Sequence, residues 1–362
     1  MAYYPMQRQM TPLAEFWCER LLPVQGEVLV HVGDLVEAGD VVAAGQLPGK
    51  LQVVDVSRAL GVGRDSIVKY LRKAIGDPVQ AHEVLAERKT MFGWGQRTCR
   101  APVTGLVLAV RAGRVLIEAE ATALELQARI RGQVAKVIDG RGAVISSVGA
   151  VVQGSWYSGD AAVGRIEIAT EDPGAPLHTQ LLDESCAGSL LVAGRLTSEG
   201  VLRLAADRGV EGMIAGSVDA SMRELLCSLP YPILIMEGFG ALPMCREAFS
   251  LLHACAECEA MIHSVAGCHT SPGRPEVLVP LEGAKSLPAE PLPAPRQLEV
   301  GMRVRGLRAP HLGAMGTVMD LPSAPQMVES GARMPVAKVL LDDGDSVWIP
   351  WANLELRHDR SI

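Results

Sequence analysis

The sequence is poor in aromatic residues and has no long apolar run. Phe, Trp and Tyr make up 4% of the 362 residues, against 37 Gly and 23 Pro, which favours a turn-rich β protein over a helical bundle. Nowhere do about 18 apolar residues follow one another, so no transmembrane helix is expected. Residues 1–22 contain Glu15 and Glu19 and lack the apolar core of a secretion signal. We therefore expect a soluble cytoplasmic protein with reduced thiols and no membrane partner.

The chain also lacks an excess of positive charge and a recognisable catalytic motif. It holds 34 Lys and Arg against 41 Asp and Glu, a formal charge of −7. This excludes a uniformly basic nucleic-acid coat but allows a local basic surface. No Walker or complete Gly-x-Gly-x-x-Gly pattern occurs, and no convincing Ser/His/Asp or Cys/His set stands out. We expect a protein that is not an enzyme and has no cofactor, with two or three domains for its length.

Two pairs of similar segments organise the first half of the chain. Residues 32–43 match residues 75–86 in a Gly-Asp pair followed by Val and Ala positions, and residues 101–110 match residues 128–137 around a central Gly. Gly-Asp favours a turn, because Gly accepts positive φ and Asp bonds nearby backbone amides. Repetition at this scale predicts similar hairpins packed into one sheet structure.

These segments resemble the barrel-sandwich hybrid of biotinyl and lipoyl carrier domains, over about residues 25–165. In those carriers a modified Lys lies at a tight hairpin apex. Lys89 lies near the corresponding place, so modification of Lys89 is one hypothesis. The flanking residues differ from the carrier pattern and the loop up to Ala101 is longer, which favours an ordinary exposed Lys. The resemblance concerns the fold, and a fold alone does not carry a function over.

Residues 54–74 show the pattern of a helix, a turn and a second helix. Asp55 or Ser57 can cap the first helix, and Gly61 permits a left-handed turn. The segment resembles a DNA-binding helix-turn-helix, which implies base- and phosphate-facing positions on the second helix. The alternative is a helical hairpin that serves only in packing. The candidate nucleic-acid contacts in this segment are Arg64, Ser66, Lys69, Arg72 and Lys73.

Residues 183–270 alternate short apolar stretches with helical patterns. This predicts a small parallel α/β domain of Rossmann-like organisation. Ligands in such sheets bind beyond the carboxyl ends of the strands, where Gly and hydroxyl residues can hold an anion or serve only as turns and caps. The candidate ligand-binding residues are Gly194, Thr197, Ser198, Gly216, Ser217, Gly238 and Gly240.

Cysteine and histidine gather at the end of the same segment. Cys255 and Cys258 have the spacing of zinc ligands, and Cys268 with His269 can complete a tetrahedral set. A second Cys-x-x-Cys is missing, and buried thiols beside surface histidines explain the same residues. A metal site is therefore a hypothesis beside the expectation of no cofactor.

Residues 278–298 hold five prolines and are expected to form a linker. Residues 299–358 then show short strand patterns, two of them joined by an Asp-Gly turn. They resemble an SH3-like barrel with a KOW motif, the module of ribosomal and transcription-elongation proteins, which implies nucleic-acid contacts through Arg303, Arg305 and Arg308. Tudor-type barrels, which bind protein tails, are similar too.

The sequence as a whole predicts a multi-domain α+β protein. The expected order is an N-terminal segment at 1–22, a barrel-sandwich β domain at 23–170 with an inserted helical hairpin at 54–74, a small parallel α/β domain at 183–270, a linker at 278–298 and an SH3-like barrel at 299–358. The favoured function is non-enzymatic binding, in association with nucleic acid or a ribonucleoprotein machine of transcription or translation. The alternatives are a protein–protein adaptor or assembly scaffold, and a carrier or small-ligand-binding protein.

Overall fold

The computed structural model shows a predominantly β protein. It describes residues 6–89, 95–264, 274–281, 296–328 and 331–357. Strands account for 48% of the structure and helices for 14%. Within these ranges, none of the helices has the length and apolar character needed to cross a membrane.

A central body is built on one mixed sheet of eleven strands. Four neighbours run parallel in the order β16, β17, β18 and β19, and every other pair in this sheet is antiparallel. The strands are β2 (Met10–Leu21), β4 (Leu35–Val36), β13 (Gly132–Ile138), β14 (Gly142–Gln153), β15 (Trp156–Ser158), β16 (Ala162–Ile168), β17 (Ser189–Leu196), β18 (Gly212–Val218), β19 (Ile233–Phe239), β20 (Glu259–Ser264) and β21 (Pro275–Pro280).

Helices cover both faces of this sheet. α4 (Arg246–Ala254) contributes Ala248 and Leu252 to one core, whereas α2 (Glu199–Asp207) and α3 (Arg223–Leu226) contribute residues such as Leu202 and Leu226 to the core on the opposite face. Both cores consist of side chains that are almost fully removed from water, which is the main source of their stability.

The predicted α+β fold class, with its separate small α/β domain, is wrong. β16 pairs with β20, β20 with β21, and β21 with β14, so the parallel strands continue directly into strands from the first half of the chain. The alternation of apolar stretches and helices is visible along the sequence. It cannot show that the edge of the parallel strands is joined to a larger β sheet, because that pairing is between distant residues.

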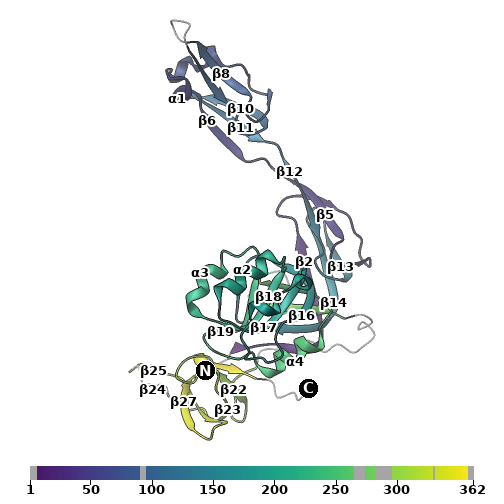
Figure 1. The fold of residues 1–362 in the computed structure, drawn as a ribbon, viewed down its shortest axis with the longest axis vertical. Coiled ribbons are helices and arrows are strands. Elements are labelled where there is room, and N and C mark those ends of the chain that lie inside the picture. Colours follow the sequence, from purple (N-terminus) through teal and green to yellow (C-terminus); the bar gives the residue numbers. More distant parts are fainter. Residues whose placement is uncertain (1–5, 90–94, 265–273, 282–295, 329–330, 358–362) are drawn as a thin grey trace.

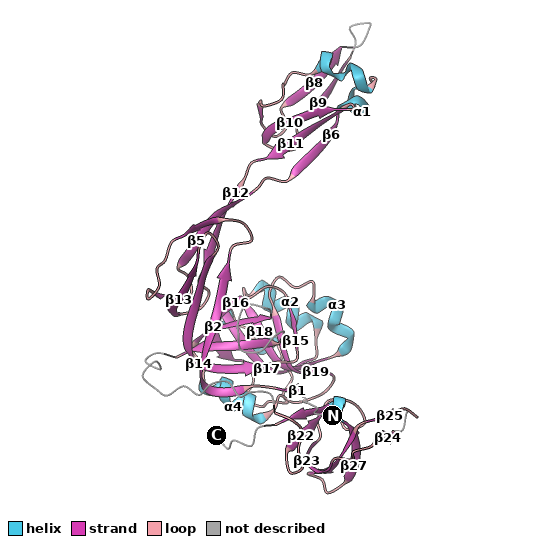
Figure 2. Ribbon diagram, turned by 180° about the vertical axis from the view of Figure 1, so that it is seen from behind, coloured by secondary structure: helices cyan, strands magenta, loops and turns pink. Residues whose placement is uncertain are grey.

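Two smaller β units extend from the body, as Figures 1 and 2 show. The paired strands β2 and β14 lead out of the body to a middle unit, which also contains β3 (Gly26–Val28), β5 (Val41–Leu47) and β12 (Thr122–Gln127). The distal unit, residues 51–119, lies between β5 and β12 in the sequence and at the far end of the molecule. Its strands are β6 (Leu51–Asp55), β7 (Pro78–Val79), β8 (Val84–Lys89), β9 (Gln96–Arg100), β10 (Gly105–Arg111) and β11 (Arg114–Ala119).

The two Gly-Asp repeats adopt the same local structure. Asp34 accepts a hydrogen bond from the backbone N–H of His31 at 2.7 Å, and Asp77 accepts the equivalent bond from Ala74 at 2.7 Å. The glycines before them, Gly33 and Gly76, both have positive φ, 98° and 93°. The repeats do not share a sheet as predicted, since β4 pairs with β13 in the central sheet while β7 pairs with β10 in the distal unit. The middle and distal units are therefore similar in their turns, and one interrupts the other.

The predicted helical hairpin at 54–74 is wrong in its second helix. α1 (Val56–Leu60) has five residues and ends at Gly61, whose φ is 63°. The second element, η1 (Arg64–Tyr70), is a 3₁₀ helix and not an α-helix. Its inward side chains, Ile67 and Tyr70, are three residues apart and so lie above one another in a 3₁₀ helix, which suits a narrow contact with the distal core.

The C-terminal unit completes its sheet with the start of the chain. β1 (Met6–Gln7) pairs in parallel with β28 (Leu354–Leu356), the last strand. The sheet order is β1-β28-β22-β23-β26-β27, and around it lies a separate core that includes Val304, Val339 and Leu354. Its other strands are β22 (Arg303–Gly306), β23 (Met315–Asp320), β26 (Val336–Leu341) and β27 (Ser346–Pro350), with a hairpin of β24 (Gln326–Met327) and β25 (Arg333–Met334).

Candidate functional site

Positive charge is concentrated in the distal unit. Residues 51–119 carry eleven Lys and Arg and six Asp and Glu, a formal charge of +5, although the whole chain carries −7. The rest of the chain therefore carries −12. Such an asymmetry between parts of one chain is the electrostatic pattern expected where one part meets a polyanion.

The start of α1 is held against the β10–β11 turn. Asp55 accepts hydrogen bonds from the backbone N–H of Arg58 at 3.0 Å and from the Ser57 hydroxyl at 2.9 Å, and these bonds lower the pKa of the Asp55 carboxyl. The backbone N–H of Ser57 donates to the carbonyl of Gly113 at 2.9 Å. A Cβ at Gly113 would lie 3.1 Å from Cγ of Arg64. Arg64 therefore extends along this turn, and Asp55 is occupied by the helix cap.

Two arginines of the β8–β9 hairpin lie against the end of α1. Nη1 of Arg88 donates to the carbonyls of Leu60 at 3.3 Å and Gly61 at 2.9 Å, which satisfies carbonyls left open at the helix end. A Cβ at Gly61 would lie 2.6 Å from Nη1 of Arg97, so the Arg97 guanidinium lies over the turn. We call Arg58, Arg64, Lys69, Arg88 and Arg97 the distal basic surface.

Three cations of this surface are available to a ligand. Arg64, Lys69 and Arg97 are exposed, and their side chains make no hydrogen bond or ion pair with any residue that the structure describes. A phosphate oxygen bound to them would therefore replace water and not an internal partner. Because η1 is a seven-residue 3₁₀ helix, these side chains suit contacts with a phosphate backbone better than insertion of a recognition helix into a groove.

Two of the predicted nucleic-acid-binding residues form ion pairs within the chain. Arg72 forms an ion pair with Glu87, and Lys73 lies 2.8 Å from both Glu83 Oε1 and the carbonyl of Pro78. The hydrogen bonds from Lys73 and Arg72 lower the pKa values of the Glu83 and Glu87 carboxyls. Ser66, the remaining predicted residue, is half-buried at the start of η1, where its backbone N–H donates to Gly63.

The C-terminal unit contributes little to a basic surface. Arg303 binds both carboxylate oxygens of Asp342, at 2.6 and 2.8 Å. Arg305 is buried and pairs with Glu237 of the central body. Of the three predicted residues in this unit only Arg308 is exposed without a partner among the described residues.

Two of the three predicted ligand-binding loops have backbone of the chain packed against their glycines. A Cβ at Gly194 would lie 2.5 Å from the carbonyl oxygen of Ala175, and a Cβ at Gly216 would lie 2.6 Å from the backbone nitrogen of Met244. Backbone therefore crosses the carboxyl ends of β17 and β18. Of the other predicted ligand-binding residues, Ser217 donates its hydroxyl to the Leu242 carbonyl at 2.6 Å. Thr197 and Ser198 are exposed before α2. Gly238 and Gly240 have positive φ, 112° and 132°.

The structure describes only some of the residues named for modification and metal binding. Lys89 ends β8 as an exposed side chain paired across the hairpin with Gln96. Cys268 and His269 lie outside the described residues. Cys255 is buried, and burial raises the pKa of its thiol to about 11, while Cys258 is half-buried. Among the described side chains no group of three His, Cys, Asp or Glu residues is placed to hold a metal ion.

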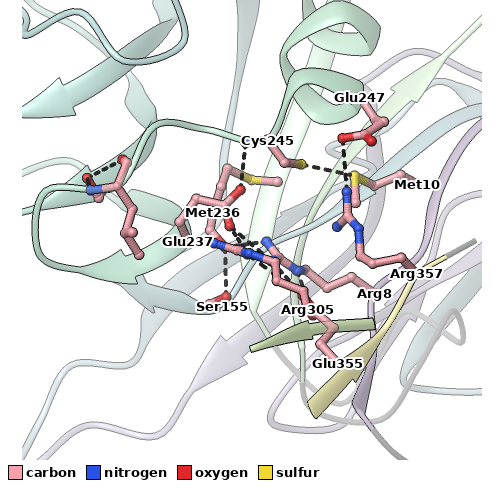
Figure 3. A network of polar contacts seen from close by, with 12 residues as sticks. Arg8, Met10, Ser155, Met236, Glu237, Cys245, Glu247, Arg305, Glu355 and Arg357 are labelled. Atoms are coloured by element: carbon pink, nitrogen blue, oxygen red, sulfur yellow. Dashed lines mark hydrogen bonds and ion pairs between the residues drawn. The ribbon is translucent and has the colours of Figure 1, made fainter. Parts of the chain in front are cut away.

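A buried ion-pair network joins three parts of the chain (Figure 3). Arg8, next to β1, lies 3.0 Å from Glu237 of β19 and 2.7 Å from Glu355 of β28. Arg305 pairs with Glu237, and Arg274 lies 3.8 Å from Glu355. Each carboxylate faces at least two guanidinium groups, so the network is a structural connection between the central body and the C-terminal unit.

Sequence reasoning missed Arg58, Arg88 and Arg97 of the distal basic surface and the ion pairs of this network, although it named Arg305 as a nucleic-acid contact. A count of charge by segment points to the first set, since the excess of Lys and Arg in residues 51–119 is visible in the sequence. The network carries no such signal, because its members are scattered from Arg8 to Glu355.

No protein-family model matches the chain, and no curated protein matches it either.

Proposed function

We propose that this is a non-enzymatic binding protein whose distal basic surface contacts the phosphate backbone of nucleic acid. The observation that carries the proposal is the formal charge of +5 on residues 51–119 of a chain with −7 overall. Arg64, Lys69 and Arg97 supply cations that no described acidic side chain neutralises. Contacts of this kind position a protein on nucleic acid without selecting its sequence.

The position of the surface supports the same function. The distal unit lies at the far end of the molecule from the central body, as both ribbon views show. Most of the acidic residues belong to the other parts of the chain. Distance from those charges reduces their repulsion of a bound polyanion, because interactions beyond about 8 Å are largely screened at physiological salt.

The test is fluorescence anisotropy of labelled duplex DNA and single-stranded RNA, titrated with protein at low salt and at about 150 mM salt. The triple variant Arg64→Glu, Lys69→Glu, Arg97→Glu is expected to lose binding. For duplex DNA, each lost phosphate contact reduces the magnitude of the negative slope of log affinity against log salt by about 0.9.

A matched control carries the same change of charge on the central body. Arg203, Arg223 and Arg246 are exposed on its helices, and their replacement by Glu is expected to leave most of the binding intact. Absence of binding at low salt, or equal losses in both triple variants, would overturn the proposal.

A protein-binding adaptor is the second candidate, and an exposed aromatic favours it. Trp348 of β27 is 46% exposed, and Leu340 and Met319 nearby in the sheet are 39% and 51% exposed. Lys338 lies 5.9 Å from the centre of the Trp348 ring. A function based on this apolar surface predicts an affinity that depends little on salt, so the same salt titration separates it from the first candidate.

A further inference from the structure

The outer face of the distal sheet carries apolar side chains that are exposed to solvent. β6, β11 and β10 are neighbours, with Val53 opposite Leu116 and Leu116 opposite Ala109. Two residues along, Leu51 lies opposite Glu118, and Glu118 opposite Leu106. Since alternate residues of a strand share a face, these side chains lie together on one side of the sheet.

This face is exposed to a degree that packing of the distal unit does not explain. Val53 is 60% exposed, Leu51 57%, Leu106 41% and Leu108, at the irregularity in β10, 37%. The distal core uses the other face, through residues such as Val115 and Ile117. Strands that are apolar on both faces are normally covered on both, and a contiguous exposed apolar patch marks an interaction site.

The two ends of this face carry opposite charges. Beyond the row of Val53 and Leu116 lie Arg114 and, directly opposite it, Arg111. At the other end the charged residue is Glu118. Arg114 is 3.7 Å from Asp55, which also caps α1, and with Arg111 this end keeps a net positive charge.

We infer that this face is the interface of a homodimer, with a second copy of the chain packed on it sheet to sheet. The two-fold axis lies in the plane of the interface, across the strands, and passes over Leu116. The face then meets itself, as an isologous contact requires. Stacked sheets are about 10 Å apart, a distance that the aliphatic side chains of the two faces fill.

The charges select this axis over the alternative. An axis along the strands would place Arg114 against Arg114 and Glu118 against Glu118. The axis across the strands places Arg114 of each copy opposite Glu118 of the other, which produces two equivalent attractions. Charge complementarity of this kind fixes the register of an interface. The distal basic surface belongs to other elements than this interface. The proposed dimer therefore does not depend on nucleic-acid binding.

Sedimentation velocity of the full chain over a range of concentrations tests the inference. The wild type is expected to show a monomer–dimer equilibrium. Arg114→Glu alone and Glu118→Arg alone are each expected to weaken the dimer at least about tenfold, because attraction becomes repulsion at two symmetric places. The double variant Arg114→Glu, Glu118→Arg restores complementarity and is expected to return the dimer.

Arg114 is exposed and Glu118 is half-buried, and far-UV circular dichroism of each variant checks that the fold is intact. Arg223→Glu on the central body is the control and is expected to leave association unchanged. A wild type that stays monomeric at every concentration overturns the inference. It is equally overturned by a dimer that neither single variant weakens, or by a double variant that remains as weak as the single ones.

Discussion

Arg8 and Glu355 form a buried, two-point ion pair between opposite ends of the chain. Nε of Arg8 lies 2.7 Å from Oε1 of Glu355, and Nη2 lies 2.7 Å from Oε2. Both side chains are about 1% exposed. Arg8 also donates to the Met236 carbonyl at 2.5 Å, so one guanidinium group connects the first segment, the central body and the last strand.

Glu355→Gln is expected to destabilise the protein by about 3–5 kcal/mol, because it leaves buried guanidinium groups without their full countercharge. Denaturant unfolding measures the change. Glu247→Gln removes a carboxylate that is 51% exposed and paired with Arg357, and it is expected to cost less than about 1 kcal/mol. Equal costs for both variants would contradict the structural role of the buried pair.

Stability is expected to fall in acid through Glu237. Burial raises the pKa of this carboxyl, but Arg8, Arg305 and the backbone N–H of Cys245 together lower it by more, so the pKa lies below the ordinary value of 4.5. A carboxyl with a lowered folded-state pKa contributes stability above its unfolded pKa and loses it as pH falls through the folded value. Between pH 7 and pH 3 the unfolding free energy of Glu237→Gln should therefore decrease less than that of the wild type. Parallel pH curves for the two proteins would show that Glu237 contributes nothing to acid sensitivity.

Gly113→Ala is expected to destabilise the distal unit more than Gly76→Ala. Both glycines have positive φ, 82° and 93°, so both variants carry a backbone cost of about 1 kcal/mol. Only at Gly113 would the new Cβ meet another atom, 2.9 Å from Cβ of Ser57, whereas no atom lies within 4 Å at Gly76. Denaturant unfolding of the two variants compares the costs, and a larger loss at Gly76 would contradict the packing of α1 on the β10–β11 turn.

Arg64→Ala is expected to weaken nucleic-acid binding more than Arg72→Ala. The Arg64 side chain has no hydrogen-bonding partner among the described residues, whereas Arg72 is paired with Glu87. Loss of a cation that contacts phosphate reduces the magnitude of the slope of log affinity against log salt by about 0.9 for duplex DNA. Loss of a cation that is paired within the protein is expected to reduce it by less. Anisotropy at several salt concentrations measures both slopes. A greater effect at Arg72 would contradict the role of Arg64 in the contact.

Local features of the structure could be predicted from the sequence, because their bonds join residues close together in the chain. In the Gly-Asp turns, Asp34 and Asp77 each bond to a backbone N–H three residues earlier. The cap of α1 by Asp55 and the left-handed turn at Gly61 also depend on neighbouring residues alone. In the site, the local pattern named Arg64 and Lys69 as candidate nucleic-acid contacts, and the structure leaves both exposed. The partners of Arg72 and Lys73 were not predicted, since Glu87 and Glu83 lie on another strand.

Sequence by itself determined the turns, the caps and the segment in which positive charge is concentrated, since short-range geometry and composition suffice for these. Only the tertiary structure decided how the pieces join. It merged the parallel strands with β14 through β20 and β21, and it placed Arg97 over Gly61. It also brought Arg8 to Glu355 across the chain. The physical reason is that strand pairing and buried charge pairing are contacts between distant residues, whose free energy depends on the whole fold and not on any local pattern.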